Sequence, residues 1–275
     1  MFNLPADKLH NAEAGIGTTE GSLPFDAPLF YVQNGKANMS ADVPALKFGG
    51  WATDAEKMDQ IVEINKRTMP PQLKKCTVTT TEGKSVSVYT ARSLVLSIAC
   101  FRTSWLSKGG KDRSPEFRDG TRRHVQILAV MAVPGTGGQL AIWGPVVLSA
   151  KGFQAKKLLA SMDDWSKHTA VIRSQIAPGL PAFMFYSAIG TFGDQPVFEM
   201  VGQGNQKSSI TPVGVRQAEL TPELMQKIYG GEALLDAISK VQDDSKQWVS
   251  AWNVASKSTG SSESLPEEET SEYPY

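Results

Sequence analysis

Apolar runs separated by polar and glycine-rich breaks occupy the middle of the chain. Residues 94–101, 125–133 and 142–148 are rich in Val, Ile, Leu and aromatic residues. Short runs of this kind, bounded by glycine or polar clusters, are typical of buried strands. The glycine-rich segment 135–138 predicts a turn between the second and third strands.

A helical period follows the third run. After Gly152, side chains suited to the interior recur three or four residues apart. They are Leu158, Met162, Trp165, Thr169 and Ile172. The proline-rich segment 178–181 ends this helix, and residues 182–189 and 210–217 predict two more strands. The order is three strands, a helix and two strands.

The N-terminal part of the chain predicts a strand and a helix. Residues 29–33 read as a strand entering the turn pair Asn34-Gly35. Thr53-Asp54-Ala55-Glu56 is a capping-box pattern that opens a helix, which we expect to end before Pro70-Pro71.

A hairpin and two C-terminal helices complete the prediction. Residues 76–79 and 86–89 flank a glycine-containing turn and predict a β-hairpin. Thr221-Pro222 opens one helix, and residues 233–252 form a second helical stretch with a partial apolar stripe. Since the heptad pattern is not sustained, we favour packing against the strands over a coiled-coil dimer seam.

This element order is that of an OB-fold, a five-stranded, partly open barrel. Its loops between strands one and two and between strands four and five bind oligonucleotides, and here they would be residues 105–123 and 191–207. We therefore predict a mainly β protein with helices. Its core would be an OB-fold-like barrel with an additional hairpin and C-terminal helices; a β-sandwich with one packed helix is the alternative.

The 275 residues are expected to form one domain with two irregular ends. Residues 1–24 lack an apolar period and predict a mobile arm, residues 25–255 the β-barrel domain, and residues 256–275 a disordered tail. We find neither a run of about 20 apolar residues nor a secretory signal. These features favour a cytoplasmic protein without a membrane partner, in which Cys76 and Cys100 stay reduced.

Charge is separated along the chain although the net charge is zero. Residues 66–124 contain thirteen Lys and Arg against four Asp and Glu, a local balance of +9. Neutralising the phosphates of a polyanion releases counterions, so this distribution favours nucleic-acid binding. The cations expected to contact phosphate are Arg92, Arg102, Lys108, Lys111, Arg113, Arg118, Arg122 and Arg123.

Aromatic residues interleave with these cations and predict stacking on bases. Trp105 and Phe117 are the strongest candidates because they fall in a polar loop, where a core role is less expected. Trp143 and Tyr186 are weaker candidates, since aromatic residues on strands usually belong to the core. His124 follows two arginines and could contact phosphate or serve a surface role.

The C-terminal tail is acidic and ends in aromatic residues. From Ser256 onward there are five carboxylates and one lysine. The residues expected to bind a partner are Glu267, Glu268, Glu269, Glu272, Tyr273, Pro274 and Tyr275. Two rings, a stiff proline and a free carboxylate form a compact end that a basic, apolar-lined pocket can hold.

This ending resembles the tail of bacterial and phage single-stranded DNA-binding proteins, in which acidic residues precede a proline and a final aromatic residue. The resemblance covers about a dozen of the 275 residues. It implies a body that binds single-stranded DNA and a tail that recruits replication or repair proteins.

Signals for catalysis are weak. Asp194 and Glu199 lack the lysine that a metal-dependent nuclease motif would place at Val201, and Glu82-Gly83-Lys84 reads as a turn. The three histidines and two cysteines form no close-spaced ligand set. We therefore expect no enzyme activity, no metal and no cofactor.

The sequence thus predicts a non-catalytic single-stranded DNA-binding protein acting in replication, recombination or repair, in the nucleoid or in the cytoplasm of a phage host. Homo-oligomers are compatible with this prediction. A structural or adaptor protein of phage origin and a strand-annealing recombination mediator are the alternatives.

Overall fold

The computed structural model describes residues 23, 25–39, 42–79, 84–107, 113–136, 139–176, 180–202 and 207–253. The predicted tail at 256–275 and, apart from the buried Leu23, the predicted arm at 1–24 lie outside the described residues.

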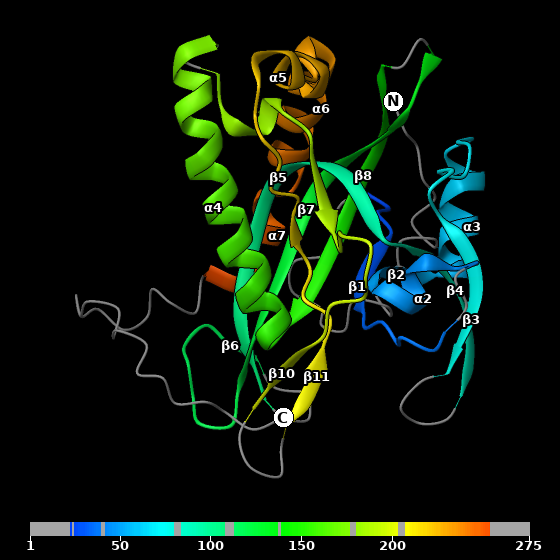
Figure 1. The fold of residues 1–275 in the computed structure, drawn as a ribbon. Helices are drawn as coiled ribbons and strands as arrows, with labels where there is room; N and C mark the ends of the chain where they lie inside the picture. Colours follow the sequence, from blue (N-terminus) through cyan, green and yellow to red (C-terminus); the bar gives the residue numbers. More distant parts are fainter. Residues whose placement is uncertain are drawn as a thin grey trace.

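One long, curled sheet forms the centre of the protein (Figure 1). All neighbouring strands in it are antiparallel except β8 and β1. The order across the sheet is β12 (Gly214–Val215), β9 (Ser187–Gly190), β5 (Ser93–Leu106), β7 (Arg122–Pro134), β8 (Leu140–Lys151), β1 (Leu29–Gln33), β2 (Gly50–Asp54), β4 (Ser85–Ala91) and β3 (Lys74–Thr79). The short β6 (Arg113–Ser114) pairs with β5, and β10 (Glu199–Val201) and β11 (Ser208–Ile210) form a separate two-stranded sheet.

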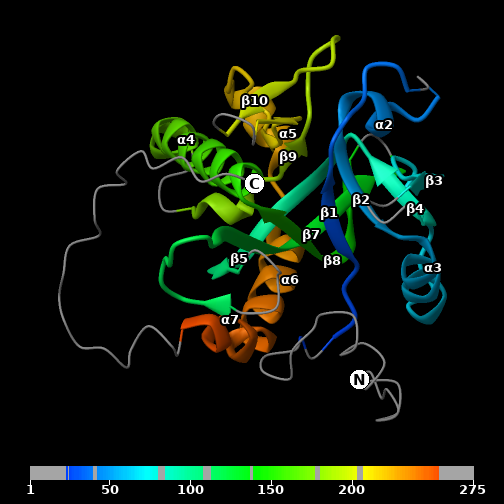
Figure 2. The ribbon, with the colours of Figure 1, turned by 90° about the horizontal axis from the view of Figure 1, so that it is seen from below.

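Helices cover both faces of the central strands. The helical segments are α2 (Pro44–Phe48), α3 (Ala55–Ile64), α4 (Phe153–Ile176), the 3-10 turn η2 (Ala182–Met184), α5 (Pro222–Ile228), α6 (Gly231–Asp244) and α7 (Lys246–Asn253). Figure 2 shows β5, β7 and β8 between α4 on one side and α6 and α7 on the other.

Each face of the sheet has its own apolar core. On the face covered by α3 and α4, Ile127 and Met131 of β7 pack with Met58 and Leu158. On the opposite face, Leu128 packs with residues of α6 and α7 that include Ile238 and Trp248. Burial on both faces explains why β7 is an uninterrupted apolar run rather than an alternating one.

The curl of the sheet brings β2 close to β9, although these two strands are not paired in the sheet. The indole Nε1 of Trp51 donates to the carbonyl oxygen of Ile189 over 2.8 Å, and Thr191 Oγ1 donates to Gly49 O over 2.8 Å. Gly50 has a φ of +148°, and a Cβ atom there would lie 2.3 Å from Ala91 O. Glycine is therefore required where the chain enters β2.

Most predicted elements are confirmed, and the differences have local causes. The helix after Asp54 ends at Ile64, and its cap is the Asp54 side chain, which accepts from Lys57 N over 2.9 Å. The predicted strand at 182–189 begins instead as η2, so β9 is short. The predicted strand at 210–217 is divided between β11 and β12.

The mainly β architecture with helices is confirmed. The hairpin of β3 and β4 extends the long sheet through β2. A closed barrel would need β8 to pair with β12. Among the described strands, one edge of β8 pairs with β7 and the other with β1, so the five strands predicted for the barrel do not close. The described strands form one long sheet and a separate two-stranded sheet. This arrangement differs from the two facing sheets of the sandwich alternative.

Replacing Trp51 by Phe tests the link between β2 and β9. The change leaves the Ile189 carbonyl without this donor and opens space around a fully buried side chain. We expect the free energy of unfolding, measured with urea, to fall by at least about 1 kcal/mol. As a control, Trp165→Phe alters a half-buried indole with no hydrogen bond among the described residues and should cost less. Equal losses in the two variants would contradict the role of this hydrogen bond.

Candidate nucleic-acid interface

The ends of β5, β6, β7 and β8 meet at one end of the sheet and gather cations there. Leu106 of β5 lies opposite Arg113 of β6 and Arg122 of β7, and His124 of β7 lies opposite Lys151 of β8. We call Arg113, Arg122, Arg123 and Lys151 the basic cluster. Figure 1 shows β6 and the β10–β11 pair towards the same end of the molecule.

An aromatic pair lies beside the basic cluster. The rings of Trp105 and Phe117 pack edge to face, with centroids 5.0 Å apart and planes 72° apart. The guanidinium of Arg123 lies 5.4 Å from the Trp105 ring centroid. Phe117 and Phe101 are 42% and 48% exposed, so aromatic surface faces solvent here. The structure thus brings together Trp105, Phe117 and Arg123, all predicted from the sequence as contact residues.

Arg102 occupies a different environment from the basic cluster. Its side chain is 4% exposed, donates to Gln126 Oε1 over 3.0 and 2.8 Å and to Trp248 O over 2.7 Å, and stacks on the Trp248 ring at 3.9 Å. Burial lowers its pKa to about 9. Arg102 therefore anchors α7 to the sheet, and its position does not fit the predicted phosphate contact.

Trp143 and Tyr186 belong to the core. They are 6% and 2% exposed, and Trp143 Nε1 donates to Thr68 O over 2.9 Å. Their positions agree with the core role that the sequence left open and do not fit base stacking.

The remaining predicted cations differ in position. Arg118 is exposed in the turn before β7, where its carbonyl oxygen accepts from Thr121 N over 2.9 Å. Arg92 is half-buried, stacks on Phe48 at 4.1 Å and donates to Gly193 O. Lys108 and Lys111 lie outside the described residues.

A buried polar row underlies the basic cluster. His124 is 3% exposed, and its Nε2 lies 2.8 Å from Ser149 Oγ. Burial, followed by the positive charges of Arg113 and Lys151, lowers the His124 pKa to about 3, so the ring is neutral at pH 7. Burial and the neighbouring Arg122 and Arg113 also lower the pKa of Lys151. These shifts show that the positive charges lie close enough to repel one another.

Lys151 is a member of the basic cluster that the sequence analysis did not identify. It ends β8, and its place beside His124 depends on the register of the β7–β8 hairpin. Neither Lys151 nor Arg122 forms an ion pair with a carboxylate in the described part of the chain. Counting along both strands from the glycine-rich turn would have placed Lys151 near His124.

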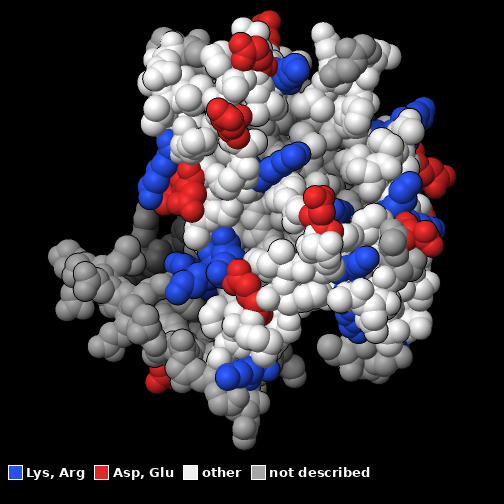
Figure 3. Space-filling view, in the orientation of Figure 1, with Lys and Arg blue, Asp and Glu red and all other residues white. Residues whose placement is uncertain are grey.

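The charge distribution, the metal-ligating residues and the helix lengths of the described part bear on other kinds of site. On the face shown in Figure 3, Lys and Arg are interspersed with Asp and Glu rather than merged into one field. Among the described residues, no three or more His, Cys, Asp or Glu gather in a way that could hold a metal ion. The described helices include none that is long and apolar enough to cross a membrane.

Comparisons of the chain with models of protein families, with curated proteins and with solved structures found no match.

The His124 shift predicts a stability loss in acid. The unfolded chain takes up a proton near pH 6.5, whereas the folded protein does so only near pH 3. The unfolded state therefore binds more protons below pH 6.5, and the free energy of unfolding should fall by about 2 kcal/mol between pH 7 and pH 5. Urea denaturation at both pH values measures this loss.

His124→Gln is the matched variant for this test. Gln keeps a hydrogen-bonding group near Ser149 and does not titrate, so the loss between pH 7 and pH 5 should largely disappear. An undiminished loss in this variant would show that another group causes it.

Proposed function

We propose that the protein is a non-catalytic single-stranded DNA-binding protein. The observation that carries this proposal is the juxtaposition of the basic cluster with the Trp105–Phe117 pair at one end of the sheet. Cations that track the backbone and rings that stack on bases are the two components of sequence-tolerant single-strand binding. A site that combines cations with exposed aromatic rings is less suited to a duplex, because the bases of a duplex are already stacked on one another.

The basic cluster supplies affinity for phosphate. Arg122 and Lys151, which lack carboxylate partners among the described residues, gain an opposite charge when a strand binds. That contact releases counterions from the DNA and offsets the repulsion from Arg122 and Arg113 that, after burial, lowers the Lys151 pKa. The binding energy is independent of sequence, as a protein that coats single strands requires.

The strand order supports an OB-fold-like core in the body. The five strands predicted for the barrel follow one another as β12, β9, β5, β7 and β8, which matches strands five, four, one, two and three of that fold. The helix between strands three and four corresponds to α4. However, α6 and α7 cover the middle of β7 and β8 on one face. We therefore propose that the DNA crosses the exposed ends of these strands.

In this proposal the acidic tail recruits replication, recombination or repair proteins in the cytoplasm. Its carboxylates compete with DNA for the basic cluster and are released when DNA binds. Tyr273, Pro274 and Tyr275 determine which partner is recruited. The tail lies outside the described residues, so this part rests on its sequence.

Titration of labelled oligo-dT and a matched duplex at two salt concentrations tests DNA binding. We expect tighter binding of oligo-dT, with an affinity that falls as salt rises. Arg122→Ala/Arg123→Ala should weaken it and reduce the slope of log K against log salt by about 1.4, because each lost single-strand phosphate contact contributes about 0.7.

The control for that variant is Lys227→Ala/Lys240→Ala, which removes the same net charge from exposed positions on α5 and α6. It should bind like the wild type. Absence of salt-dependent binding in the wild type, or equal weakening in both double variants, would overturn the proposed interface.

Deletion of residues 264–275 tests the tail. We expect DNA binding to stay equal or become tighter, since a competing anion is removed, and association with replication or repair proteins to be lost. Electrophoretic mobility shifts and co-purification from the host measure the two effects. Weaker DNA binding after deletion would contradict competition by the tail.

A further inference from the structure

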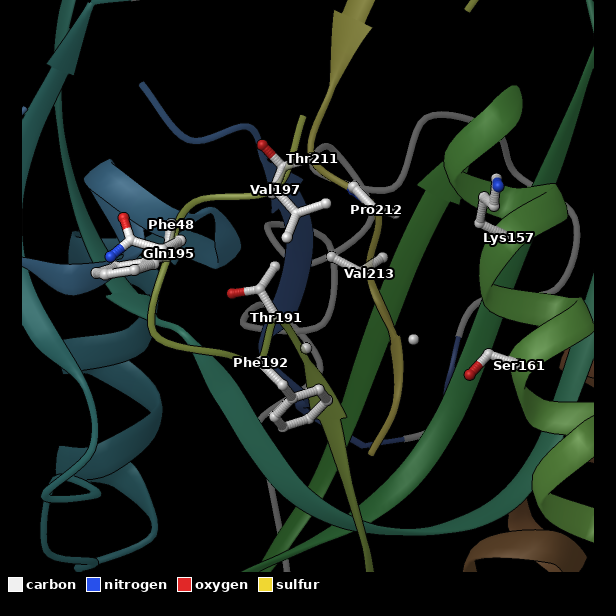
Figure 4. Close-up of a pocket in the computed structure, with 12 residues that line it drawn as sticks. Phe48, Lys157, Ser161, Thr191, Phe192, Gln195, Val197, Thr211, Pro212 and Val213 are labelled. Atoms are coloured by element: carbon white, nitrogen blue, oxygen red, sulfur yellow. The ribbon is translucent and has the colours of Figure 1, made fainter. Parts of the chain in front are cut away.

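A hollow of about 310 Å³ lies beside α4, and part of its lining comes from the segment 191–207 that the sequence predicts as the second binding loop (Figure 4). Its walls come from the segment after β9, from the chain leading into β12, from α4 and from Phe48 at the end of α2. The volume is at the lower end of the range for small-molecule sites, about 300 to 1,000 Å³. It therefore suits a group the size of a nucleoside.

Two aromatic rings in the hollow are each accompanied by an arginine. The Arg92 guanidinium lies 4.1 Å from the Phe48 ring centroid, and the Arg216 guanidinium lies 5.9 Å from that of Phe192. Both rings are half-buried. A cation on one side of a ring and a base on the other is an arrangement by which proteins hold single strands.

The walls of the hollow are held in place by buried hydrogen bonds. Thr211 is 1% exposed, and its Oγ1 accepts from Gly35 N over 2.9 Å. Ser161 Oγ accepts from Val215 N over 2.8 Å and so fixes α4 against β12. A preformed site of this kind loses little conformational entropy when a ligand enters.

Charged and polar groups surround the opening. Lys157 of α4 pairs with Glu199 over 2.7 Å, and Asp194 is exposed on the segment after β9. With Arg92 and Arg216, the cations outnumber these two acids. Gln195 is exposed and lines the hollow (Figure 4), where its amide can reach the edge of a base.

The hollow lies within reach of a strand bound at the basic cluster. Gly152, which precedes α4, donates its N–H to Arg123 O over 2.7 Å. Lys157 is five residues further on, a rise of about 7.5 Å along the helix. The first turns of α4 therefore connect the Trp105–Arg123 contact to the rim of the hollow.

We infer that this hollow receives one base of the bound single strand, stacked on Phe192, while Lys157 and Arg216 lie near its flanking phosphates. The inference rests on the proposed function and adds a second stacking position to it. Phe192 and Gln195 lie in the loop 191–207 that the sequence predicts as a binding loop, and Arg92 is one of its predicted phosphate contacts. Phe48, Lys157 and Arg216 were not predicted as contacts.

The test compares oligo-dT with an abasic strand of the same length, in wild-type protein and two variants. Phe192→Ala should bind oligo-dT about 5- to 150-fold more weakly and leave the affinity for the abasic strand unchanged. Phe198→Ala is the control, because this phenylalanine is 41% exposed six residues away and does not line the hollow. It should bind both strands like the wild type.

The other outcomes of this test distinguish failure of the base-binding site from failure of the proposed function. If Phe192→Ala binds oligo-dT like the wild type, or loses equally on both strands, the base-binding site is wrong and the proposed function stands. If the wild type binds neither strand, both proposals are lost.

Ultraviolet crosslinking of the wild-type protein to oligo-dT provides a measurement that needs no variant. A thymine-modified peptide containing Phe192 or Phe48 supports the inference. Crosslinks confined to the peptides of Trp105 and Phe117 would overturn it even if Phe192→Ala failed to fold.

Discussion

Burial of β7 on both faces is the constraint on which the rest of the structure depends. With α4 against one face and α6 and α7 against the other, the middle of this strand has no surface to offer a ligand. Chemistry is therefore confined to the strand ends and to the segments that leave them. The basic cluster and the hollow both lie at such positions, and α4 contributes to the walls of one and begins beside the other.

Where the central strands pass from the apolar core to the polar surface, their buried polar side chains need hydrogen-bond partners. Arg102 is buried because Gln126 and the Trp248 carbonyl take up its donors and the Trp248 ring covers it. His124 is buried because it stays neutral and lies against Ser149. Without these partners, burying the polar groups would cost more than their packing returns. The buried Arg102 and His124 thus support the cations of the basic cluster without a phosphate-binding role of their own.

Periodicity and charge predicted the strands, the hairpin, the long helix and the region where cations meet aromatic residues. The sequence patterns could not show which of the expected contact residues face the interior. Arg102 and Arg122 look alike in sequence, but α7 covers only the first, and that depends on contacts across 146 positions. Trp143 and Tyr186 are buried by elements distant in the sequence, whereas Trp105 is placed by its immediate neighbours on β5 and β6. Local order was therefore predictable, and side-chain exposure was decided by long-range packing.

The parallel pairing of β1 with β8 has a consequence for the order of folding. The β5–β7 and β7–β8 pairs join neighbouring segments, so they close short loops. By contrast, Leu29 pairs with Val147, and Trp51 bonds to Ile189 across 138 positions. Such contacts pay a larger loop-closure entropy before they return any energy. During synthesis, β1 leaves the ribosome long before β8 exists, so the edge of β1 that pairs with β8 stays unpaired until the centre of the sheet has formed.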